Sequence, residues 1–381
     1  MLTLGTWLSW LSLFFLYLIY DGYGRVLQAL RLLLGERQPV RTDAPPDAAV
    51  TVIIPAYNEE QRIRSKLENV LAQDYPADRL EVIVVSDGST DGTEAIATEF
   101  AARVALVRTA GRQGKSRAQN QAVAQARGEI LVLTDMAAVM AADCVRHLVA
   151  PFADPRVGCV TSRLLHTAEQ SVTGQDQTRY WSYELKLRRL ESELGVLATT
   201  AGPAMAMRCS LWKDLAPDFG DDCVLPLDVV LQGQRVVQAE SAVAWDVNLE
   251  TAAQEFRARV RMTVRNWLGT FSRGSLLNPF RHPQYAFALW LHKIVRWLSP
   301  VFVVGLLGGT VLVAAGGGWW TPLALVSLFL TLGAAGVVGL YRRQRWPLLA
   351  TVGTFLLVNC AFLVGLIWVW RGHSIKIYQN C

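Results

Sequence analysis

Three stretches of the chain are apolar and carry no charged side chain. They are residues 1–20, 298–341 and 347–370. Each is long enough to cross a bilayer as a helix, which takes about 20 apolar residues. The second stretch is too long for one such helix at about 1.5 Å per residue, and three glycines at 316–318 interrupt it. We therefore predict four transmembrane helices, one at 1–22 and three within 295–371.

Between these stretches, short apolar runs alternate with segments whose apolar residues recur at helical spacing. Runs rich in Val, Ile and Leu that alternate with helices are typical of a parallel sheet covered on both faces. The predicted fold class is therefore α/β, with one large domain at 48–250. The predicted strands are 50–55, 80–85, 104–108 and 129–133, and the predicted helices are 59–73, 93–102 and 116–126.

Composition agrees with this division of the chain. Of the 381 residues, 18% are charged, whereas an average soluble domain has about a quarter. A purely soluble protein and a disordered chain are therefore excluded. The six cysteines show neither close pairing nor metal-ligand spacing, which argues against a disulfide framework. No Lys or Arg precedes the first apolar stretch and no cleavage site follows it, so we expect a retained anchor there and not a signal peptide.

Basic residues flank the apolar stretches unevenly. Four arginines follow the first stretch, and the loop at 341–346 holds three more. Basic loops stay in the cytoplasm. We therefore expect a multi-pass protein of the cell (inner) membrane, with a cytoplasmic catalytic domain and both termini outside. Arg371 and Lys376, after the last stretch, favour the opposite side for the C-terminus.

Region 251–280, just before the C-terminal spans, contains a basic amphipathic pattern. The apolar residues at spacings of three and four are Phe256, Val260, Val264, Trp267, Leu268 and Phe271, and the arginines alongside are Arg257, Arg261 and Arg265. Such a helix is typical of one lying in the membrane interface, where anionic lipid attracts basic side chains. We predict an interfacial helix here.

Polar residues follow the predicted strands, at the edge where α/β sheets bind ligands. They include Asn58 and Glu59 after the first strand, the segment 87–93 after the second, Lys115 before a helix, and Asp135 after a later strand. A plain turn with a helix cap would account for part of segment 87–93. The chain has no GxxxxGK[ST], and no GxGxxG follows the first strand, which argues against a phosphate-loop hydrolase and a dinucleotide enzyme. A nucleotide site remains, in which carboxylates hold ribose, base or a cation and Lys115 meets phosphate.

These motifs, in this order, resemble those of a membrane-bound family 2 inverting glycosyltransferase. The matching segments are Val52 to Glu60, Val84 to Thr93, Gly114-Lys115 and Arg127 to Asp135, and the resemblance continues to Trp267. It covers about two thirds of the chain and is closest to the polysaccharide-synthase branch. It implies a Rossmann-like GT-A nucleotide-sugar domain followed by membrane helices.

The resemblance implies the donor site. Asp87 corresponds to the carboxylate that contacts the uracil or ribose of a UDP-sugar, in a pocket formed with Pro55, Tyr57 and Glu59. Lys115 corresponds to the basic residue near the diphosphate. Asp135 holds the first position of the DxD-type motif, which binds Mg²⁺ or Mn²⁺ between the phosphates. The second acidic position is Ala137, so either Asp135 holds the cation with phosphates and water, or another residue substitutes, or metal binding is weak.

The resemblance also implies the catalytic and acceptor residues. Asp222, beside Asp221, corresponds to the general base that deprotonates the acceptor hydroxyl. A neighbouring negative charge raises the basicity of a carboxylate. A surface pair of acidic residues in a turn is the alternative. The acceptor side would be lined by Trp267, Gly202 and Trp181, although core packing alone would explain Trp181. Of the family's QxxRW motif only Trp267 is present, because Thr263 and Asn266 occupy the Gln and Arg positions.

We therefore expect a hexosyltransferase-like enzyme that transfers a sugar from a UDP-linked donor to a lipid-linked or growing glycan acceptor. Its partners would be these substrates, membrane lipids and glycan assembly or export proteins, and no nucleic acid. Two alternatives stay open. One is a processive exopolysaccharide synthase, and the other is a catalytically silent subunit of a glycan assembly complex, which Ala137 and Asn266 suggest.

Overall fold

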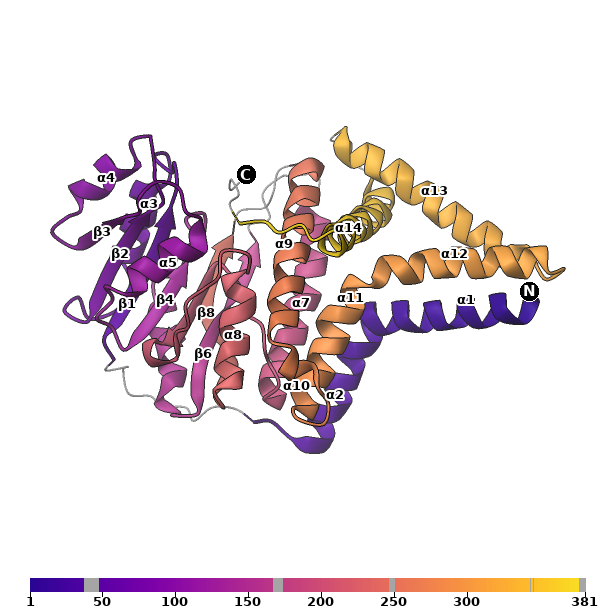
Figure 1. Cartoon of the computed structure of the whole chain (residues 1–381), viewed down its shortest axis with the longest axis horizontal. Helices are drawn as coiled ribbons and strands as arrows, with labels where there is room; N and C mark the ends of the chain where they lie inside the picture. Colours follow the sequence, from indigo (N-terminus) through magenta and orange to yellow (C-terminus); the bar gives the residue numbers. More distant parts are fainter. Residues whose placement is uncertain (38–47, 167–173, 247–250, 343, 345, 377–381) are drawn as a thin grey trace.

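Eight strands form one sheet in the computed structural model of the chain (Figure 1). The structure describes residues 1–37, 48–166, 174–246, 251–342, 344 and 346–376, apart from the side chains of residues 166, 174–181 and 347. The strand order is β3-β2-β1-β4-β7-β6-β8-β5. The strands are β1 (Val50–Ala56), β2 (Leu80–Ser86), β3 (Val104–Arg108), β4 (Ile130–Thr134), β5 (Val139–Met140), β6 (Val157–His166), β7 (Ala204–Arg208) and β8 (Arg235–Asp246).

The first four strands are parallel, as predicted. β1 pairs with β2 and β4 in parallel, and β2 pairs with β3. Helices connect them, because parallel neighbours need a crossover from one edge of the sheet to the other. The carboxyl ends of β1, β2 and β4 therefore lie side by side.

The other half of the sheet is mixed, which the sequence analysis did not predict. β7 runs antiparallel to β4, with Thr134 opposite Ala204. The start of β7 therefore lies beside the end of β4. Both the Asp135 N–H and the Thr134 hydroxyl donate to the Pro203 carbonyl, at 3.3 and 2.8 Å. Because of this pairing, the segment around Gly202 lies at the same edge of the sheet as Asp135.

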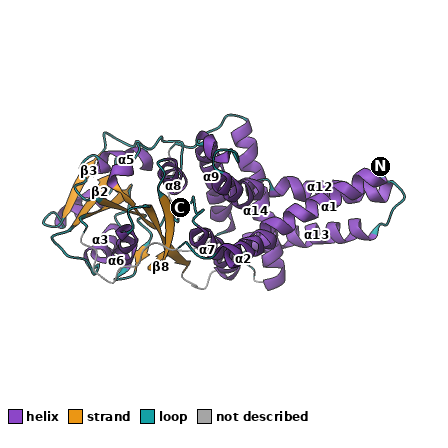
Figure 2. Cartoon of the chain, turned by 90° about the horizontal axis from the view of Figure 1, so that it is seen from below, coloured by secondary structure: helices purple, strands orange, loops and turns teal. Residues whose placement is uncertain are grey.

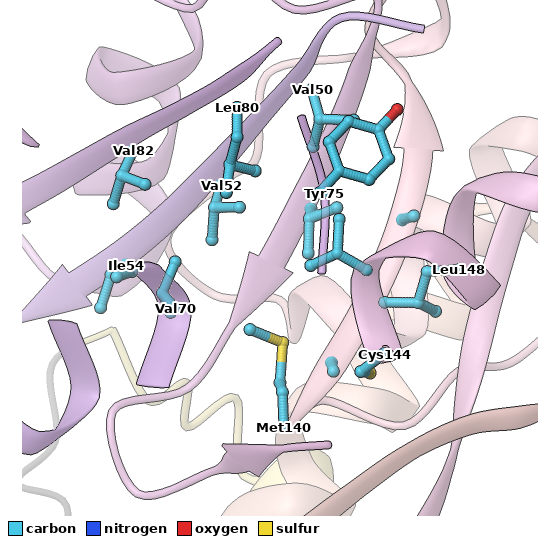
Figure 3. Packing of buried hydrophobic residues seen from close by; sticks show 14 of the residues in the cluster. Val50, Val52, Ile54, Val70, Tyr75, Leu80, Val82, Met140, Cys144 and Leu148 are labelled. Atoms are coloured by element: carbon cyan, nitrogen blue, oxygen red, sulfur yellow. The ribbon is translucent and has the colours of Figure 1, made fainter. Parts of the chain in front are cut away.

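Helices cover both faces of the sheet (Figure 2). On one face, α3 (Ile63–Leu71), α4 (Thr93–Glu99) and α6 (Cys144–Val149) pack on Val52, Ile54 and Val82 (Figure 3). On the other face, α5 (Lys115–Val123) and α8 (Asp221–Leu231) pack on Ile53 and Leu133. Burying one such aliphatic side chain contributes about 1.5–3 kcal/mol. Successive side chains of β1 point to opposite faces of the sheet, so this strand stabilises the helix layers on both faces.

The N-terminal apolar helix is longer than predicted. α1 (Leu2–Tyr17) continues through a π-helical turn, Leu18–Gly22, into α2 (Tyr23–Leu34). α2 packs on α7 (Gly174–Leu194), in a cluster that contains Tyr23, Leu27 and Leu187. The end of this helix therefore belongs to the region near the sheet, while Figure 1 places the N-terminus at the far end of the molecule.

The C-terminal apolar helices are α12 (Ser299–Ala315), α13 (Thr321–Tyr341) and α14 (Pro347–Trp370). The predicted break between the first two is confirmed, and Gly317 turns the chain with φ of 79°, a conformation that favours glycine. Before α12, a bent segment holds α10 (Pro283–Ala288), the π-helical Leu289–Ile294 and α11 (Val295–Trp297). Among the described residues, three helices are long and apolar enough to cross a membrane, or four if the bent pair 283–315 is one span.

The amphipathic helix predicted within 251–280 is present as α9 (Ala252–Ser272), but its arginines are not all exposed. Arg265 is 5% exposed and donates to the carbonyls of Pro217, Phe219 and Ile375. The expectation that Arg265 contacts the membrane is therefore wrong, because the loop before α8 and the C-terminal segment cover this side of α9. α9 and α7 stand between the sheet and the apolar helices (Figure 1).

α14 and the residues after it return to the α/β part of the molecule, and the side of the membrane on which each terminus lies stays a prediction. α14 packs along α9, since Ala350 and Leu357 cluster with Ala252, and Gly365 lies against Thr263. The residues after α14 reach Arg265 through the carbonyl of Ile375, at 2.7 Å. The C-terminal segment thus lies beside the sheet, whereas the N-terminus lies at the far end of the apolar helices (Figure 1).

One buried cluster joins the two parts of the molecule. It runs from Leu133 in the sheet through Leu225 in α8 to Trp297, Val358 and Phe362 in the C-terminal helices. Because these residues share one core, the α/β part has a fixed position relative to the helices. Three short 3₁₀ helices, Ala150–Ala153, Cys209–Leu211 and Gly274–Leu277, complete the described fold.

Candidate functional site

Asp87 anchors the loop that follows β3. It comes directly after β2, and its carboxylate accepts the N–H groups of Gln113 and Gly114 at 2.7 and 2.8 Å. Gly114 has φ of 92°, which lets its N–H point at Asp87 and places Lys115 at the start of α5. Asp87 is 5% exposed. It therefore positions Lys115, and contact with a nucleotide stays a prediction.

The other predicted nucleotide residues follow β1 at the same edge. Pro55 lies opposite Val85 in the sheet. The Arg112 guanidinium lies over the Tyr57 ring, 3.9 Å from its centre, so the two planar groups form one wall. The Glu59 carboxylate lies 3.3 Å from Arg62, and burial raises its pKa even though Arg62 opposes the effect.

Asn58 ties the two loops of this edge together. Its φ is 52°, uncommon for a residue with a side chain, and its Oδ1 accepts the Thr90 N–H at 2.8 Å. In turn, its own N–H donates to the Ser89 hydroxyl at 3.2 Å. Strained backbone of this kind concentrates at binding sites. The loops after β1 and β2 therefore form one preorganised rim beside Tyr57.

Lys115 joins two of the predicted carboxylates. Its ammonium lies 2.6 Å from Asp135 Oδ1 and 2.9 Å from Asp221 Oδ2. The Gln119 amide also donates to Asp221, at 2.8 Å. Burial alone would raise the pKa of Asp221, but Lys115 and then Gln119 outweigh it, so this pKa is lowered. Asp221 is an ionised partner that holds Lys115 in place.

The pKa of Asp222 shifts in the opposite direction to that of Asp221, although the two residues are neighbours in the chain. Both acidic residues lie in the first turn of α8, after Gly220, so the alternative of a surface turn is wrong. Burial, then the negative charge of Asp221, raises the pKa of Asp222 from 3.8 to about 6. The backbone carbonyl of Asp222 accepts the Thr200 hydroxyl at 2.9 Å, which fixes the helix start against the Gly202 segment. A carboxylate of this basicity suits proton abstraction near neutral pH.

Gly202 leaves space between two carboxylates. A Cβ atom at this position would lie 3.4 Å from Asp135 Oδ2 and 3.8 Å from Asp222 Oδ2. Both carboxylates therefore face the same small volume. A reacting group in it would meet Asp135 on one side and Asp222 on the other.

The residues at this edge fit a divalent cation that the donor brings with it. The Asp135 side chain is 37% exposed, whereas the Ala137 methyl supplies no ligand. Among the described residues, no three His, Cys, Asp or Glu side chains converge on one point. Mg²⁺ commonly takes one or two carboxylates and completes its shell with phosphates and water. Asp135 is the residue that would hold such a cation.

A cavity begins on the other side of Asp222. Its lining comes from α7, the loop before β7, α8, α9, the π-helical Leu289–Ile294, α11 and α14, and includes Thr200, Asp222, Asn266, Trp297 and Phe362. Basic residues line it as well: Arg188, Arg259, Lys293 and Arg296. Asp222 therefore separates the Lys115 and Asp135 pair from a second compartment that extends to the apolar helices.

The predicted acceptor residues are only partly at this cavity. Trp267 stacks on Phe271 and lies 5.8 Å from the ring of Trp297, so it supports the cavity wall from behind. Gly202 is near Asp222, as described above. The side chain of Trp181 lies outside the described residues, and its role stays a prediction.

Several residues of the site were missed in the sequence. Arg112 and Gln119 carry no motif, and the cavity arginines lie on helices far apart in the chain. Lys66 in α3 is 3% exposed and donates to the Thr134 hydroxyl and the Ala138 carbonyl, at 2.8 and 2.6 Å. Burial lowers its pKa to about 8. A lysine on the apolar face of a predicted helix was the signal that could have revealed this support for the Asp135 loop.

Comparison with known proteins matches the α/β part to one family. The family model described as glycosyl transferase family 2 matches residues 51–215. An N-acetylglucosaminyltransferase of Rhizobium meliloti is 29% identical over 327 residues, 81% of this chain and 75% of the relative. A poly-β-1,6-N-acetyl-D-glucosamine synthase of Staphylococcus epidermidis is 24% identical over 306 residues, 76% of this chain and 71% of the relative.

A solved structure shares the fold over nearly the whole chain. It is a mannosyltransferase from Pyrobaculum calidifontis in complex with GDP-Man and Mn²⁺. The TM-score is 0.73 at 24% identity, over 96% of this chain and 100% of the other. The combination of a GT-A-like sheet with apolar helices at both ends therefore occurs in a known structure.

Proposed function

Because the chain carries a family 2 glycosyltransferase domain with candidate membrane helices at both ends, we propose that it transfers N-acetylglucosamine from UDP-N-acetylglucosamine to a glycan acceptor at the membrane. The sugar is suggested by the relatives, which are named N-acetylglucosaminyltransferase and poly-β-1,6-N-acetyl-D-glucosamine synthase. UDP as the nucleotide follows from the resemblance of the motifs around Tyr57, Asp87 and Lys115.

The position and basicity of Asp222 carry this proposal. Asp222 takes the proton of the acceptor hydroxyl, whose oxygen attacks the anomeric carbon from the face opposite the diphosphate. The bond from that carbon to the β-phosphate oxygen breaks, and UDP leaves with the electron pair. One displacement without a covalent sugar intermediate inverts the anomeric configuration. Asp221 stays ionised and holds Lys115 at the leaving group.

The donor side uses the residues along the strand edge. The Tyr57 and Arg112 wall and the Asn58 loop receive the nucleoside, and Lys115 turns from Asp135 to the diphosphate. Asp135 would hold a divalent cation brought by the donor, and such a cation would neutralise the charge that develops on the leaving UDP. Gly202 keeps the volume between Asp135 and Asp222 open for the sugar.

For the membrane, we propose three crossings, a cytoplasmic catalytic unit at 48–250 and an interfacial region at 251–280. α1, α12 and α13 cross, whereas α14 packs against α9 and has one face on lipid. Figure 1 views α14 nearly end-on, while α1 and α12 lie across the picture, so α14 runs across their direction. In this arrangement Arg371 and Lys376 are cytoplasmic, as basic flanking residues usually are.

The donor is tested with purified protein in nanodiscs and a panel of nucleotide-sugars. UDP-N-acetylglucosamine in the presence of Mn²⁺ is expected to give UDP release that rises when membrane glycolipid acceptors are added. Release from a GDP-sugar alone would refute the proposed donor. A cysteine placed after Lys376 tests the crossings, because it should be labelled from the same side as one placed in the catalytic unit.

A processive synthase is the second candidate, and the relative from Staphylococcus epidermidis, by its name, favours it. The two candidates differ in product length. Wild-type protein with excess donor gives a single added sugar in the first case and a ladder of products in the second, which gel or mass analysis separates.

A further inference from the structure

The cavity beyond Asp222 has an unusual charge for a site that would bind a neutral sugar. Four cationic side chains line it, Arg188, Arg259, Lys293 and Arg296, against two carboxylates, Glu184 and Asp222. Glu255, just outside the lining, pairs with Arg259 at 2.6 Å, which leaves three cations against two carboxylates in the lining, even with Asp222 ionised. Buried charge is costly unless an opposite charge compensates it. The lining is suited to an anion.

Glu184 gathers most of these cations at one end of the cavity. Lys293 and Arg188 lie 3.0 and 3.3 Å from its carboxylate, and Arg296 also donates to it. His292 lies 3.1 Å away and bridges to Glu191 at 2.7 Å. Arg259 on α9 pairs with Glu255 at 2.6 Å. The basic groups are thus held in place by buried carboxylates and do not need the ligand for their positions.

The uncharged part of the lining is mixed, because apolar side chains lie there beside the polar Thr199, Thr200, Thr263, Asn266 and Thr270. Trp297 ends the bent segment before α12, and Phe362 comes from α14. Met262 of α9 is a further apolar side chain of the lining. A ligand in the cavity would therefore touch Asp222, the cations and these apolar side chains.

The volume of the cavity limits which part of a ligand fits between the cations. It measures about 70 Å³, and since one water needs about 10–15 Å³ of such volume, about five water-sized groups fit. A phosphate group has this size, so one such group fits between the cations. The cation-lined volume is suited to a single anionic group.

The general base restricts the attacking group of the acceptor. A phosphate oxygen is already ionised at neutral pH and needs no base, whereas a sugar hydroxyl does. Asp222, with Asp221 beside it, serves a hydroxyl. The acceptor must therefore bring a hydroxyl to Asp222 and can bring a separate anion to the cations.

Building on the proposed transferase function, we propose that the acceptor is a lipid-linked glycoside whose phosphate binds among Arg188, Lys293 and Arg296 while its sugar hydroxyl reaches Asp222. The lipid chain leaves past Trp297 and Phe362 into the bilayer. The donor diphosphate binds elsewhere, at Lys115 and Asp135, so the enzyme has one phosphate site on each side of Asp222.

Binding is tested separately from turnover, with dodecyl phosphate as the probe. In a neutral detergent, dodecyl phosphate is expected to raise the Tm of the full-length protein, because a ligand that binds the folded state stabilises it. Dodecyl glucoside at the same concentration, and inorganic phosphate at the same ionic strength, should give no comparable rise. Equal effects of dodecyl phosphate and dodecyl glucoside overturn the proposal. An equal effect of inorganic phosphate assigns the cavity to soluble phosphate and also overturns it.

Variants connect the effect to the cavity. Lys293→Gln removes one cation, and Asn266→Asp adds a negative charge to the lining with almost no change of shape. Each should weaken dodecyl phosphate binding about tenfold or more, the usual effect of losing one interaction with a charged group. Lys293→Arg should keep most of the binding. Arg281→Gln removes an exposed charge outside the lining and is the matched control. Unchanged binding in both Lys293→Gln and Asn266→Asp overturns the proposal.

Turnover is compared for two acceptors with the same sugar and alkyl chain, one with a phosphodiester between them and one without. The kcat/KM ratio should favour the phosphorylated acceptor at least about tenfold in the wild type and fall in Lys293→Gln. Equal kcat/KM values refute the phosphate site but leave the transferase function intact. If no donor supports UDP release, the proposed function fails, and the dodecyl phosphate measurement still decides whether the cavity binds the anion.

Discussion

Replacing Asp222 by Asn should inactivate the enzyme and stabilise it at the same time. The carboxylate is held next to Asp221 and out of bulk solvent, so its ionised form is unfavourable in the folded protein. An amide of the same shape removes that unfavourable charge. The amide accepts no proton from the acceptor hydroxyl, so transfer is lost. A gain in stability together with a loss of activity is expected for a group whose charge is kept for function at the expense of stability.

The size of the stability gain follows from the pKa. Folding raises the pKa of Asp222 from 3.8 to about 6, and since one pKa unit corresponds to about 1.36 kcal/mol, the ionised form costs at most about 3 kcal/mol. Asp222 keeps some contact with the cavity solvent, which screens the charge, so we expect a gain of about 1–2 kcal/mol. A folded-state pKa above the unfolded value means that the destabilisation is absent below about pH 4 and complete above about pH 6.

Asp221→Asn is the matched control, because the same change one residue earlier has the opposite sign. The pKa of Asp221 is lowered in the folded protein, so its ionised form stabilises the fold at neutral pH and this contribution is lost as the pH falls through the folded-state pKa. The variant leaves Lys115 and Gln119 without their carboxylate partner, which costs about 1–3 kcal/mol.

Tm values of the three proteins in the same detergent provide the assay, at pH 4 and pH 7.5. A change of 1 kcal/mol shifts the Tm of a domain of 150–250 residues by about 2–4 °C. At pH 7.5 Asp222→Asn should melt several degrees above the wild type and Asp221→Asn below it. At pH 4 Asp222→Asn and the wild type should agree. A lower Tm for Asp222→Asn at pH 7.5 would refute the reasoning on its charge.

Two further predictions concern activity, and a third concerns UDP binding. The kcat/KM for transfer should fall about tenfold for each pH unit below about 6, because only ionised Asp222 accepts the proton; a rate that is flat down to pH 5 would contradict a base of this pKa. Ala137→Asp should lower the Mn²⁺ concentration for half-maximal activity about tenfold, because a second carboxylate joins Asp135. Titration of activity with Mn²⁺ tests this, with Ala137→Asn as the uncharged control. Equal midpoints for the two variants would count against a cation at Asp135. Lys115→Met should weaken UDP binding about tenfold or more, whereas Lys115→Arg should keep part of it, since lysine and arginine can both bind a diphosphate. Calorimetric titration with UDP measures the affinity of both variants. Unchanged binding by Lys115→Met would remove Lys115 from the donor site.

The part of the site that follows the strands could be predicted from the sequence. β1, β2 and β4 are continuous apolar runs, and parallel strands bring their carboxyl ends to one edge, so Asp87 and Asp135 had to lie there. Asp221 and Asp222 were recognised by their motif. Their place in the first turn of α8 explains why two adjacent carboxylates point to different partners.

The rest could not be predicted, because it depends on which elements pack together. Lys115 meets Asp221 only because α5 and α8 share one face of the sheet. The cavity cations come from three helical segments that have no common sequence pattern. The apolar stripe of α9 was visible in the sequence, but nothing local says whether lipid or α14 covers it. Burial of Arg265 is the clearest case, since a basic residue on an amphipathic helix suggests a membrane surface.

The central claim, that Asp222 directs a single inverting displacement, is tested most directly by the anomeric configuration of the product. UDP-N-acetylglucosamine carries an α-linked sugar. NMR of the product formed by the wild type should therefore show a β-linkage, and Asp222→Asn should form no product while still binding UDP. An α-linked product, or full transfer by Asp222→Asn, would contradict the account.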